Sequence, residues 1–183
     1  MTMNTSRMVL RLAGLMALGL SVAGCGMIGG KKEQTASRSF VQVDADDLEC
    51  LQRAMFFESH RSSRDGLVAV GNVVMNRVKS DAYPDTICGV VGQKNQFAPG
   101  VMTRPMTSSG LPTVQEAAIS VMRGERHPMI GDAKFFHQAG HRFSYDNMNY
   151  VVTAGGNAFY EKRKAAYVTQ PVPLPPTEGL TLR

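Results

Sequence analysis

The chain has 183 residues, of which 43% are hydrophobic and 19% charged, and its formal net charge is +5. This composition is typical of a globular protein rather than a disordered or fibrous one, and the length suits one domain with appendages. No block of basic residues with interleaved aromatic ones occurs, so the sequence gives no indication of nucleic-acid binding.

Residues 1–24 have the pattern of a bacterial lipoprotein signal peptide. Arg7 and Arg11 precede an apolar run, residues 12–23, that is too short to span a bilayer but suits the core of a signal peptide. The segment Val22-Ala23-Gly24-Cys25 resembles a lipobox, whose cysteine is acylated and becomes the mature N-terminus. The alternative is an uncleaved anchor with an incidental cysteine.

Acylation of Cys25 predicts firm attachment to a membrane, because several acyl chains hold a protein far better than one. Gly26, rather than Asp, favours the outer membrane of a Gram-negative cell, with the protein facing the periplasm. Residues 25–45 are small and polar without a sustained period, which predicts a flexible tether. Cleavage removes two of the 20 basic residues and none of the 15 acidic ones, so the mature charge is +3.

Two helices joined by a polar turn begin the predicted folded domain, residues 46–162. The first runs from about residue 46 to Glu58, after acidic residues that suit a helix start. The second has Asp65 as its expected N-cap and ends at Val78. Because it is apolar on almost all sides, it is predicted to be a central buried helix, with a strand as the competing interpretation. The small side chain of Gly71 allows neighbours to pack closely.

The next segments predict a short helix, a long loop and a second secure helix. Pro84 suits the first turn of a helix that ends at Gly92. Residues 93–112 contain three prolines and two glycines, which predicts a functional or mobile loop that forms a cleft wall. Thr113 and Glu116 have the spacing of a capping box, and the helix that follows ends at Gly124.

The last part of the chain has only short apolar pieces. Residues 133–137, 150–152 and 158–160 are separated by Gly and Asn, so small strands or extended loops are expected there. Residues 163–183 are Pro-rich and without periodicity, which predicts a disordered tail.

Cys50 and Cys88 are the thiols that remain after acylation of Cys25. An even pair in an oxidising compartment favours a disulfide, and two buried free thiols are the alternative. The bond would close a loop of roughly 38 residues, worth about 3 to 4 kcal/mol in the chain-entropy model.

Six short motifs lie in order along the folded part of the chain, over about residues 48–160. They are Cys50-Leu51 with Phe57-Glu58, the second helix from Gly66 to Val78, Tyr83-Pro84-Asp85 with Thr86 to Val91, Asn95-Gln96-Phe97, Ala133-Lys134-Phe135-Phe136-His137, and Gly156-Asn157-Ala158-Phe159-Tyr160. Together they closely resemble the SleB-type, or spore-cortex-lytic, cell-wall hydrolase family.

The resemblance implies an α+β fold that is lysozyme-like and lytic-transglycosylase-like, mainly helical with a small β element. It also implies cleavage of the MurNAc–GlcNAc bond in the glycan strands of peptidoglycan, with Glu58 in the place of the family's acid/base. The chain differs from the family pattern mainly in the turn of residues 59–63, which concerns substrate contacts more than the reaction.

The residues around Glu58 support the same role. Met55-Phe56-Phe57 can form an apolar wall that raises the pKa of Glu58, as protonation of a glycosidic oxygen near neutral pH requires. The alternative is an ordinary helix-terminal glutamate. Hydrolysis through two carboxylates needs a second acid about 5 to 10 Å away. The candidates, none in a comparably apolar setting, are Asp65, Asp81, Asp85, Asp132 and Asp146. A transglycosylase needs one carboxyl group, because the C6 hydroxyl of the substrate attacks C1.

Several other residues are candidates for substrate binding. The Gln96 amide can bind an N-acetyl group and the Phe97 ring can stack on a sugar, although Phe97 can equally anchor its loop. His137 is either a substrate donor or a structural histidine. Asn157, Phe159 and Tyr160 are expected in the far wall of the cleft, with Tyr160 as a polar-tipped sugar contact.

Asn76 and Arg77 are expected to brace the turn beside Glu58. The four histidines, His60, His127, His137 and His141, match no zinc-binding spacing, so no metal or other cofactor is expected. Three functions stay open: a lytic transglycosylase, a hydrolytic muramidase or glucosaminidase, and a catalytically inactive peptidoglycan-binding lipoprotein.

Overall fold

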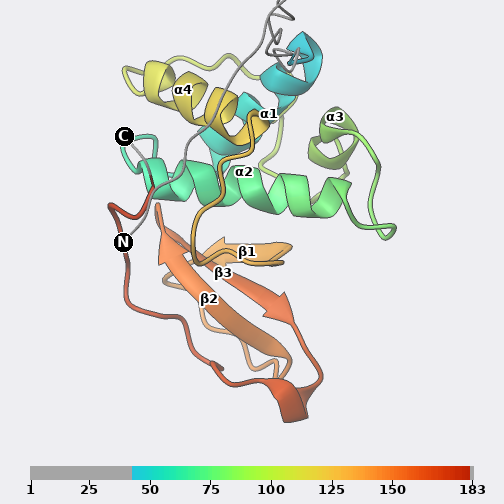
Figure 1. Ribbon diagram of the computed structural model, residues 1–183, viewed down its shortest axis with the longest axis vertical. Coiled ribbons are helices and arrows are strands. Elements are labelled where there is room, and N and C mark those ends of the chain that lie inside the picture. Colours follow the sequence, from blue (N-terminus) through green and yellow to red (C-terminus); the bar gives the residue numbers. More distant parts are fainter. Residues whose placement is uncertain (1–42, 182–183) are drawn as a thin grey trace, which may run out of the picture. The chain divides into compact units, whose positions relative to one another are not determined.

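The computed structural model describes residues 43–181, which form four α-helices, a three-stranded sheet and one 3-10 turn (Figure 1). The predicted signal peptide, the predicted acylation site Cys25 and almost all of the predicted tether lie outside the described residues. Within residues 43–181, no helix is long and apolar enough to cross a membrane.

The first helix, α1 (Ala45–Glu58), has nearly the predicted bounds. The Asp44 carboxylate is its N-cap and accepts hydrogen bonds from the backbone N–H groups of Asp46 and Asp47, both 3.0 Å long. Leu51 and Met55 are fully buried on its inner face. The helix ends where Ser59 turns extended, so Glu58 is placed at the very edge of the helical layer.

The second helix, α2 (Arg64–Val78), is the buried centre of the domain, as its apolar pattern predicts. It lies between α1 and α4 on one side and the sheet on the other (Figure 1). Gly71 is needed there, since a Cβ atom would come 2.2 Å from Cε of Met55. The predicted N-cap is wrong: Ser63 caps the helix, while Asp65 lies in the first turn with its side chain buried.

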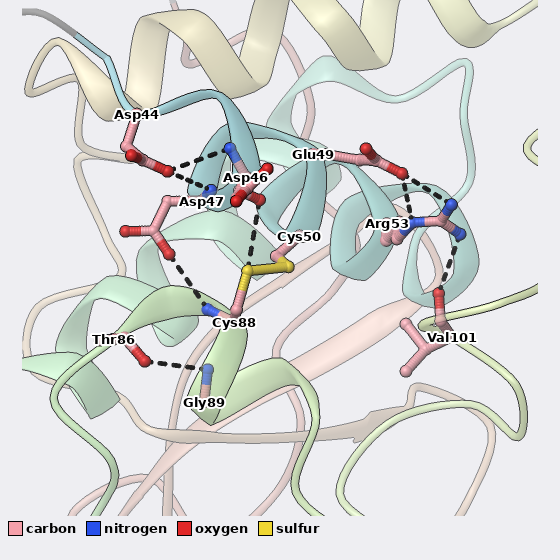
Figure 2. The surroundings of a disulfide bond; sticks show 10 residues. All are labelled: Asp44, Asp46, Asp47, Glu49, Cys50, Arg53, Thr86, Cys88, Gly89 and Val101. Carbon is pink, nitrogen blue, oxygen red and sulfur yellow. Dashed lines mark hydrogen bonds and ion pairs between the residues drawn. A yellow bond between two sulfur atoms is a disulfide. The ribbon is translucent and has the colours of Figure 1, made fainter.

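The third helix, α3 (Ile87–Val91), is attached to α1 by the Cys50–Cys88 disulfide (Figure 2). The two Cα atoms are 5.2 Å apart. The Asp47 carboxylate also accepts a hydrogen bond from the backbone N–H of Cys88, at 3.2 Å. The helix begins after Thr86, whose hydroxyl caps it, rather than at Pro84 as predicted, and Gly92 ends it.

The predicted long loop follows α3 and is held against α1 by Arg53. The Arg53 guanidinium pairs with Glu49 and donates to the carbonyl oxygen of Val101 at 3.3 Å (Figure 2). It also donates to the carbonyl oxygen of Arg104 at 2.8 Å. The backbone of this loop is therefore fixed on the side that faces α1.

The fourth helix, α4 (Leu111–Met122), buries the predicted stripe of Val114, Ala117, Ala118 and Val121. The predicted capping box is wrong, because Gly110 is the N-cap and no side chain caps the helix. Pro112 in the first turn explains the earlier start, since proline lacks an N–H and is preformed for helix there.

The sheet consists of β1 (Phe135–Gln138), β2 (Met148–Ala154) and β3 (Asn157–Lys162), all antiparallel, in the order β1-β3-β2. These are the three predicted short segments, now confirmed as strands. Phe159 and Val152 belong to the main core that the sheet shares with the helices, while Tyr150 and Tyr160 belong to a second, smaller cluster.

The prediction of a disordered tail at residues 163–183 is wrong for the described part. Residues 163–181 continue past the predicted domain end through the 3-10 turn η1 (Ala165–Tyr167) and back to the start of α2 (Figure 1). Backbone hydrogen bonds hold this segment, for example from Thr177 N–H to the Thr153 carbonyl at 2.8 Å. Backbone hydrogen bonds do not require hydrophobic side chains at regular intervals, so the sequence pattern does not predict that this segment is ordered.

Candidate active site

Glu58 is the last residue of α1, and segments from distant parts of the chain bond to it. The backbone N–H of Ala98, in the long loop, donates to Oε1 at 2.5 Å. The side-chain amide of Asn157, in β3, donates to the Glu58 carbonyl oxygen at 2.5 Å. Helix end, loop and sheet are therefore joined at this residue.

The pKa of Glu58 is raised above the usual value of a glutamate. Burial is the main cause, because the charged carboxylate loses hydration. The Ala98 N–H and the positive charge of Arg77 act in the opposite direction and lower the pKa, but burial outweighs them. The direction is the one that a general acid needs, since a larger fraction of the group stays protonated near neutral pH.

Glu58 lines a cleft of about 380 Å³. The walls come from the end of α1 and the turn after it, from α2, from the long loop, from β1 and from the β2–β3 turn. The lining residues are Glu58, His60, Arg77, Gln96, Phe136, His137, Gln138, Gly155, Gly156 and Asn157.

No other carboxylate among the described residues lines this cleft. Asp65 is buried against the C-terminal segment, Asp81 and Asp132 line a separate hollow, and Asp85 and Asp146 are exposed elsewhere. Glu178 lies in a neighbouring hollow, where its two carboxylate oxygens accept from Gly155 N–H at 2.9 Å and from the Ser63 hydroxyl at 2.6 Å. The cleft thus has one acid.

Arg77 gives the cleft a buried positive charge. Its Nε donates to the Lys134 carbonyl at 2.8 Å, and its guanidinium lies over the rings of Tyr83 and Phe97. Nη1 is buried and has no hydrogen-bond partner among the described residues. Arg77 therefore braces the segment before β1 rather than the turn after Glu58, which corrects the prediction.

Asn76 is corrected in the same way. Its amide donates to the carbonyl oxygens of Gly131 and Ala133, at 2.9 and 3.0 Å, so it also holds the chain that leads into β1.

Three of the five predicted substrate-binding residues, Gln96, His137 and Asn157, line the cleft. The His137 ring is held at both nitrogens, with Nε2 2.8 Å from the Tyr150 hydroxyl and Nδ1 2.9 Å from the Gln138 carbonyl. Asn157 uses its amide on the Glu58 backbone, so it positions the acid.

Phe97, Phe159 and Tyr160 do not line the cleft, contrary to prediction, and Phe159 is fully buried in the main core. Phe97 is buried in the main core between Phe136 and Arg77, so it anchors its loop and offers no face to a sugar. Tyr160 belongs to the second cluster, where it packs on Phe135 and Tyr150.

Sequence reasoning missed His60 and the glycines of the β2–β3 turn as cleft residues. Gly155 and Gly156 have positive φ angles, 54° and 86°. A Cβ atom on Gly156 would come 2.7 Å from the His60 ring, so the turn needs glycine for this contact as well. Two adjacent glycines between apolar strand pieces are the signal that marks such a turn.

Among residues 43–181, no three His, Cys, Asp or Glu side chains come together in a way that could hold a metal ion. His127 is buried beside Asp65, with Nε2 3.9 Å from Oδ2, and its backbone N–H donates to Asn72. Its pKa is lowered by burial, although the charge of Asp65 acts against this.

The family model of the cell wall hydrolases matches residues 61–160, which is more than half of the chain. The chain belongs to the cell wall hydrolase family. The match covers α2 to β3, and Glu58 lies just before it. The SleB-type resemblance noted from the motifs is thereby confirmed.

A curated relative is the spore cortex-lytic enzyme of Oceanobacillus iheyensis, 31% identical over 73 residues. That match covers 38% of this chain and 26% of the relative, so the chain spans about a quarter of the relative's length.

Two solved structures share the fold of this cell wall hydrolase. One is the catalytic domain of the germination-specific lytic transglycosylase SleB from Bacillus anthracis, with TM-score 0.54 and 23% identity, covering 66% of this chain and 98% of that domain. The catalytic domain of Bacillus cereus SleB gives the same TM-score and identity, with 64% and 91% covered. The predicted α+β, lysozyme-like fold is confirmed.

Proposed function

We propose that this protein is a lytic transglycosylase that cleaves the MurNAc–GlcNAc bond in peptidoglycan glycan strands, with Glu58 as the single acid and base. The observation that carries the proposal is the cleft with one carboxylate, whose pKa is raised by burial. An inverting or retaining hydrolase needs a second carboxylate about 5 to 10 Å from the first. Membership of the cell wall hydrolase family supplies the substrate class.

The proposed reaction uses Glu58 twice. The protonated carboxyl group first donates its proton to the glycosidic oxygen, and the bond from that oxygen to C1 of MurNAc breaks. The carboxylate then removes the proton of the C6 hydroxyl, whose oxygen forms a bond to C1. The products are a 1,6-anhydro end and a free hydroxyl on the leaving sugar, and Glu58 is protonated again.

The surrounding groups suit both states of Glu58. The Ala98 N–H and the Arg77 charge favour the carboxylate that forms after the first proton transfer, and burial favours the acid before it. The Asn157 amide fixes the backbone from which Glu58 projects. Gln96 lines the cleft, and its side-chain amide can donate to sugar oxygens or to the N-acetyl carbonyl.

Product analysis tests the reaction type. Purified sacculi digested by the protein are expected to release muropeptides with 1,6-anhydro ends, identified by mass spectrometry. Products with reducing ends would instead indicate that the protein is a hydrolytic muramidase or glucosaminidase. Binding to sacculi without release of any product would indicate a catalytically inactive, peptidoglycan-binding lipoprotein.

We further propose that Cys25 anchors the protein by lipid to the cell envelope, in the outer membrane facing the periplasm. The lipobox-like sequence and the Cys50–Cys88 disulfide, which suits an oxidising compartment, support this. Metabolic labelling with a fatty acid is expected to mark the wild type but not Cys25→Ser. Equal labelling of both would overturn the anchor.

A further inference from the structure

A second hollow of about 500 Å³ opens between the turn after Glu58 and the start of α4. Its size is in the range of ligand pockets. The lining residues are His60, Arg61, Ser62, Ser108, Ser109, Gly110 and Thr113. These side chains offer four hydroxyl groups, one imidazole and one guanidinium, and no carboxylate. Hydrogen-bond donors with one positive charge and no negative charge suit an anion with several oxygens.

Arg61 is the unneutralised cation of this hollow. Its Nη1 donates to the Phe56 carbonyl at 3.1 Å, and its guanidinium lies 4.8 Å from the centre of the Phe56 ring. Within residues 43–181, Arg61 forms no ion pair. Arg64, one turn further on, is different, because Glu116 and Glu125 both bind it at 2.9 and 2.6 Å. The other donors of the exposed Arg61 guanidinium are therefore available to a ligand.

This hollow adjoins the cleft of Glu58, and the two share one lining residue. His60 lines both concavities, and it packs on Gly156 at the far side of the cleft. Gly110 approaches the backbone of Arg61 so closely that a Cβ atom there would come 3.1 Å from the Arg61 carbonyl oxygen. A ligand that branches away from a sugar in the cleft would pass His60 and reach Arg61.

We infer that this second hollow binds the acidic stem peptide that MurNAc carries, with Arg61 pairing a peptide carboxylate and the hydroxyl groups binding its amides. The inference rests on the proposed function, because it takes the substrate to be peptidoglycan with its peptides attached. It adds that the protein prefers strands bearing peptides to bare glycan.

The first test compares rates on intact sacculi and on sacculi stripped of peptides by an amidase. The quantity measured is the rate on intact sacculi divided by the rate on stripped sacculi. General damage to folding or catalysis lowers both rates and cancels in this ratio. Arg61→Gln is expected to lower this ratio about fivefold, as loss of one partly exposed charged contact predicts, and Arg61→Lys less. Arg123→Gln removes an equal charge at the exposed opposite end of α4 and is expected to keep the wild-type ratio. An unchanged ratio in Arg61→Gln overturns the inference.

If the protein cleaves neither substrate, the proposed function fails, but the peptide site can still be tested by measuring binding. The probe is a soluble muramyl tripeptide, which has no glycosidic bond to cleave, and MurNAc without peptide is the reference ligand. Calorimetry at low salt is expected to show tighter binding of the tripeptide by wild type and Arg123→Gln, and about fivefold weaker binding by Arg61→Gln. Equal affinity of wild type and Arg61→Gln for the tripeptide contradicts a peptide site at Arg61.

Discussion

Two opposing effects act on the Glu58 carboxyl group, and their balance fits an acid that must also become a base. Burial raises its pKa, and the Ala98 N–H with the Arg77 charge limits the rise. In a fully apolar site the pKa of Glu58 would be so high that the group could not readily transfer its proton to the glycosidic oxygen. A solvated site would lose the proton before the substrate arrived.

The pH dependence of activity follows from this balance. Activity is expected to fall as the pH rises through the raised pKa of Glu58, because the acid form is lost. Arg77→Gln removes the nearby positive charge, so the pKa of Glu58 rises further and the alkaline limb of the pH–rate profile moves to higher pH. The profile of kcat/KM on a soluble glycan measures this.

Arg77→Lys is the matched control, because it keeps a positive charge at the same position. Its alkaline limb is expected to stay close to that of the wild type, even if the loss of the guanidinium contacts with Lys134 and Phe97 lowers stability. An identical alkaline limb in Arg77→Gln and the wild type would show that Arg77 does not influence the acid.

At the scale of elements, the C-terminal segment is bound to the first turn of α2. Asp65 is buried there and accepts hydrogen bonds from Leu180 N–H and Thr181 N–H, both 2.8 Å long, and from the Thr181 hydroxyl. Burial alone would raise the pKa of Asp65, but these hydrogen bonds outweigh it and lower the pKa. The same segment places Glu178 on Gly155, which lines the cleft.

Thr181→Val is expected to lower the free energy of unfolding by about 1 to 2 kcal/mol at pH 7, because the Asp65 carboxylate loses one donor. Since the pKa of Asp65 is lowered by folding, its contribution is present above the usual aspartate pKa of about 4 and lost as the pH falls through the lowered value. The difference from wild type should therefore shrink below about pH 4. Urea unfolding at pH 7 and pH 3 measures both values.

Thr177→Val makes the same substitution nearby, where the hydroxyl donates only to the Pro175 carbonyl at 3.3 Å and is exposed. Its effect is expected to stay within about 0.5 kcal/mol. If the two variants lose equal stability, the Asp65–Thr181 contact is not what holds the segment.

The disulfide is a second connection between elements, from α1 to α3 across 38 residues. Its loss in the double variant Cys50→Ala/Cys88→Ala is expected to cost about 3 to 4 kcal/mol of unfolding free energy, chiefly through the entropy of the unfolded chain. Urea unfolding with and without a thiol reductant measures it, and the reductant should affect the wild type only. A wild type insensitive to full reduction would contradict this account.

At the scale of the whole molecule, the sequence predicts the helices and strands well where a hydrophobic period is strong. The apolar stripes of α1, α2 and α4 and the three short strand pieces all lie where expected. The N-caps of α2 and α4 differ from the predicted ones, because Ser63 and Gly110 compete with equally plausible residues two and three positions further on, respectively. Local patterns do not decide between them.

The composition of the cleft was predicted only in part, since it depends on contacts across long sequence separations. Asn157 reaches the carbonyl of Glu58 over 99 residues, and Ala98 reaches its carboxylate over 40. Residues 163–181 are held by backbone hydrogen bonds and buried polar groups, and neither produces a hydrophobic periodicity in the sequence. Glu58, the proposed acid, stands out in the sequence because it ends an apolar helix face within a recognisable motif.

The central claim is that Glu58 is the acid and base of the cleft, and the most direct measurement compares product release from sacculi by wild type, Glu58→Gln and Glu49→Gln. Glu49 is an exposed glutamate on the same helix, so its variant controls for the substitution. We predict that Glu58→Gln abolishes the release of 1,6-anhydro muropeptides while its melting temperature stays equal or rises, because a buried charge is removed. Glu49→Gln should keep full activity. Product release at the wild-type rate by folded Glu58→Gln would contradict the account.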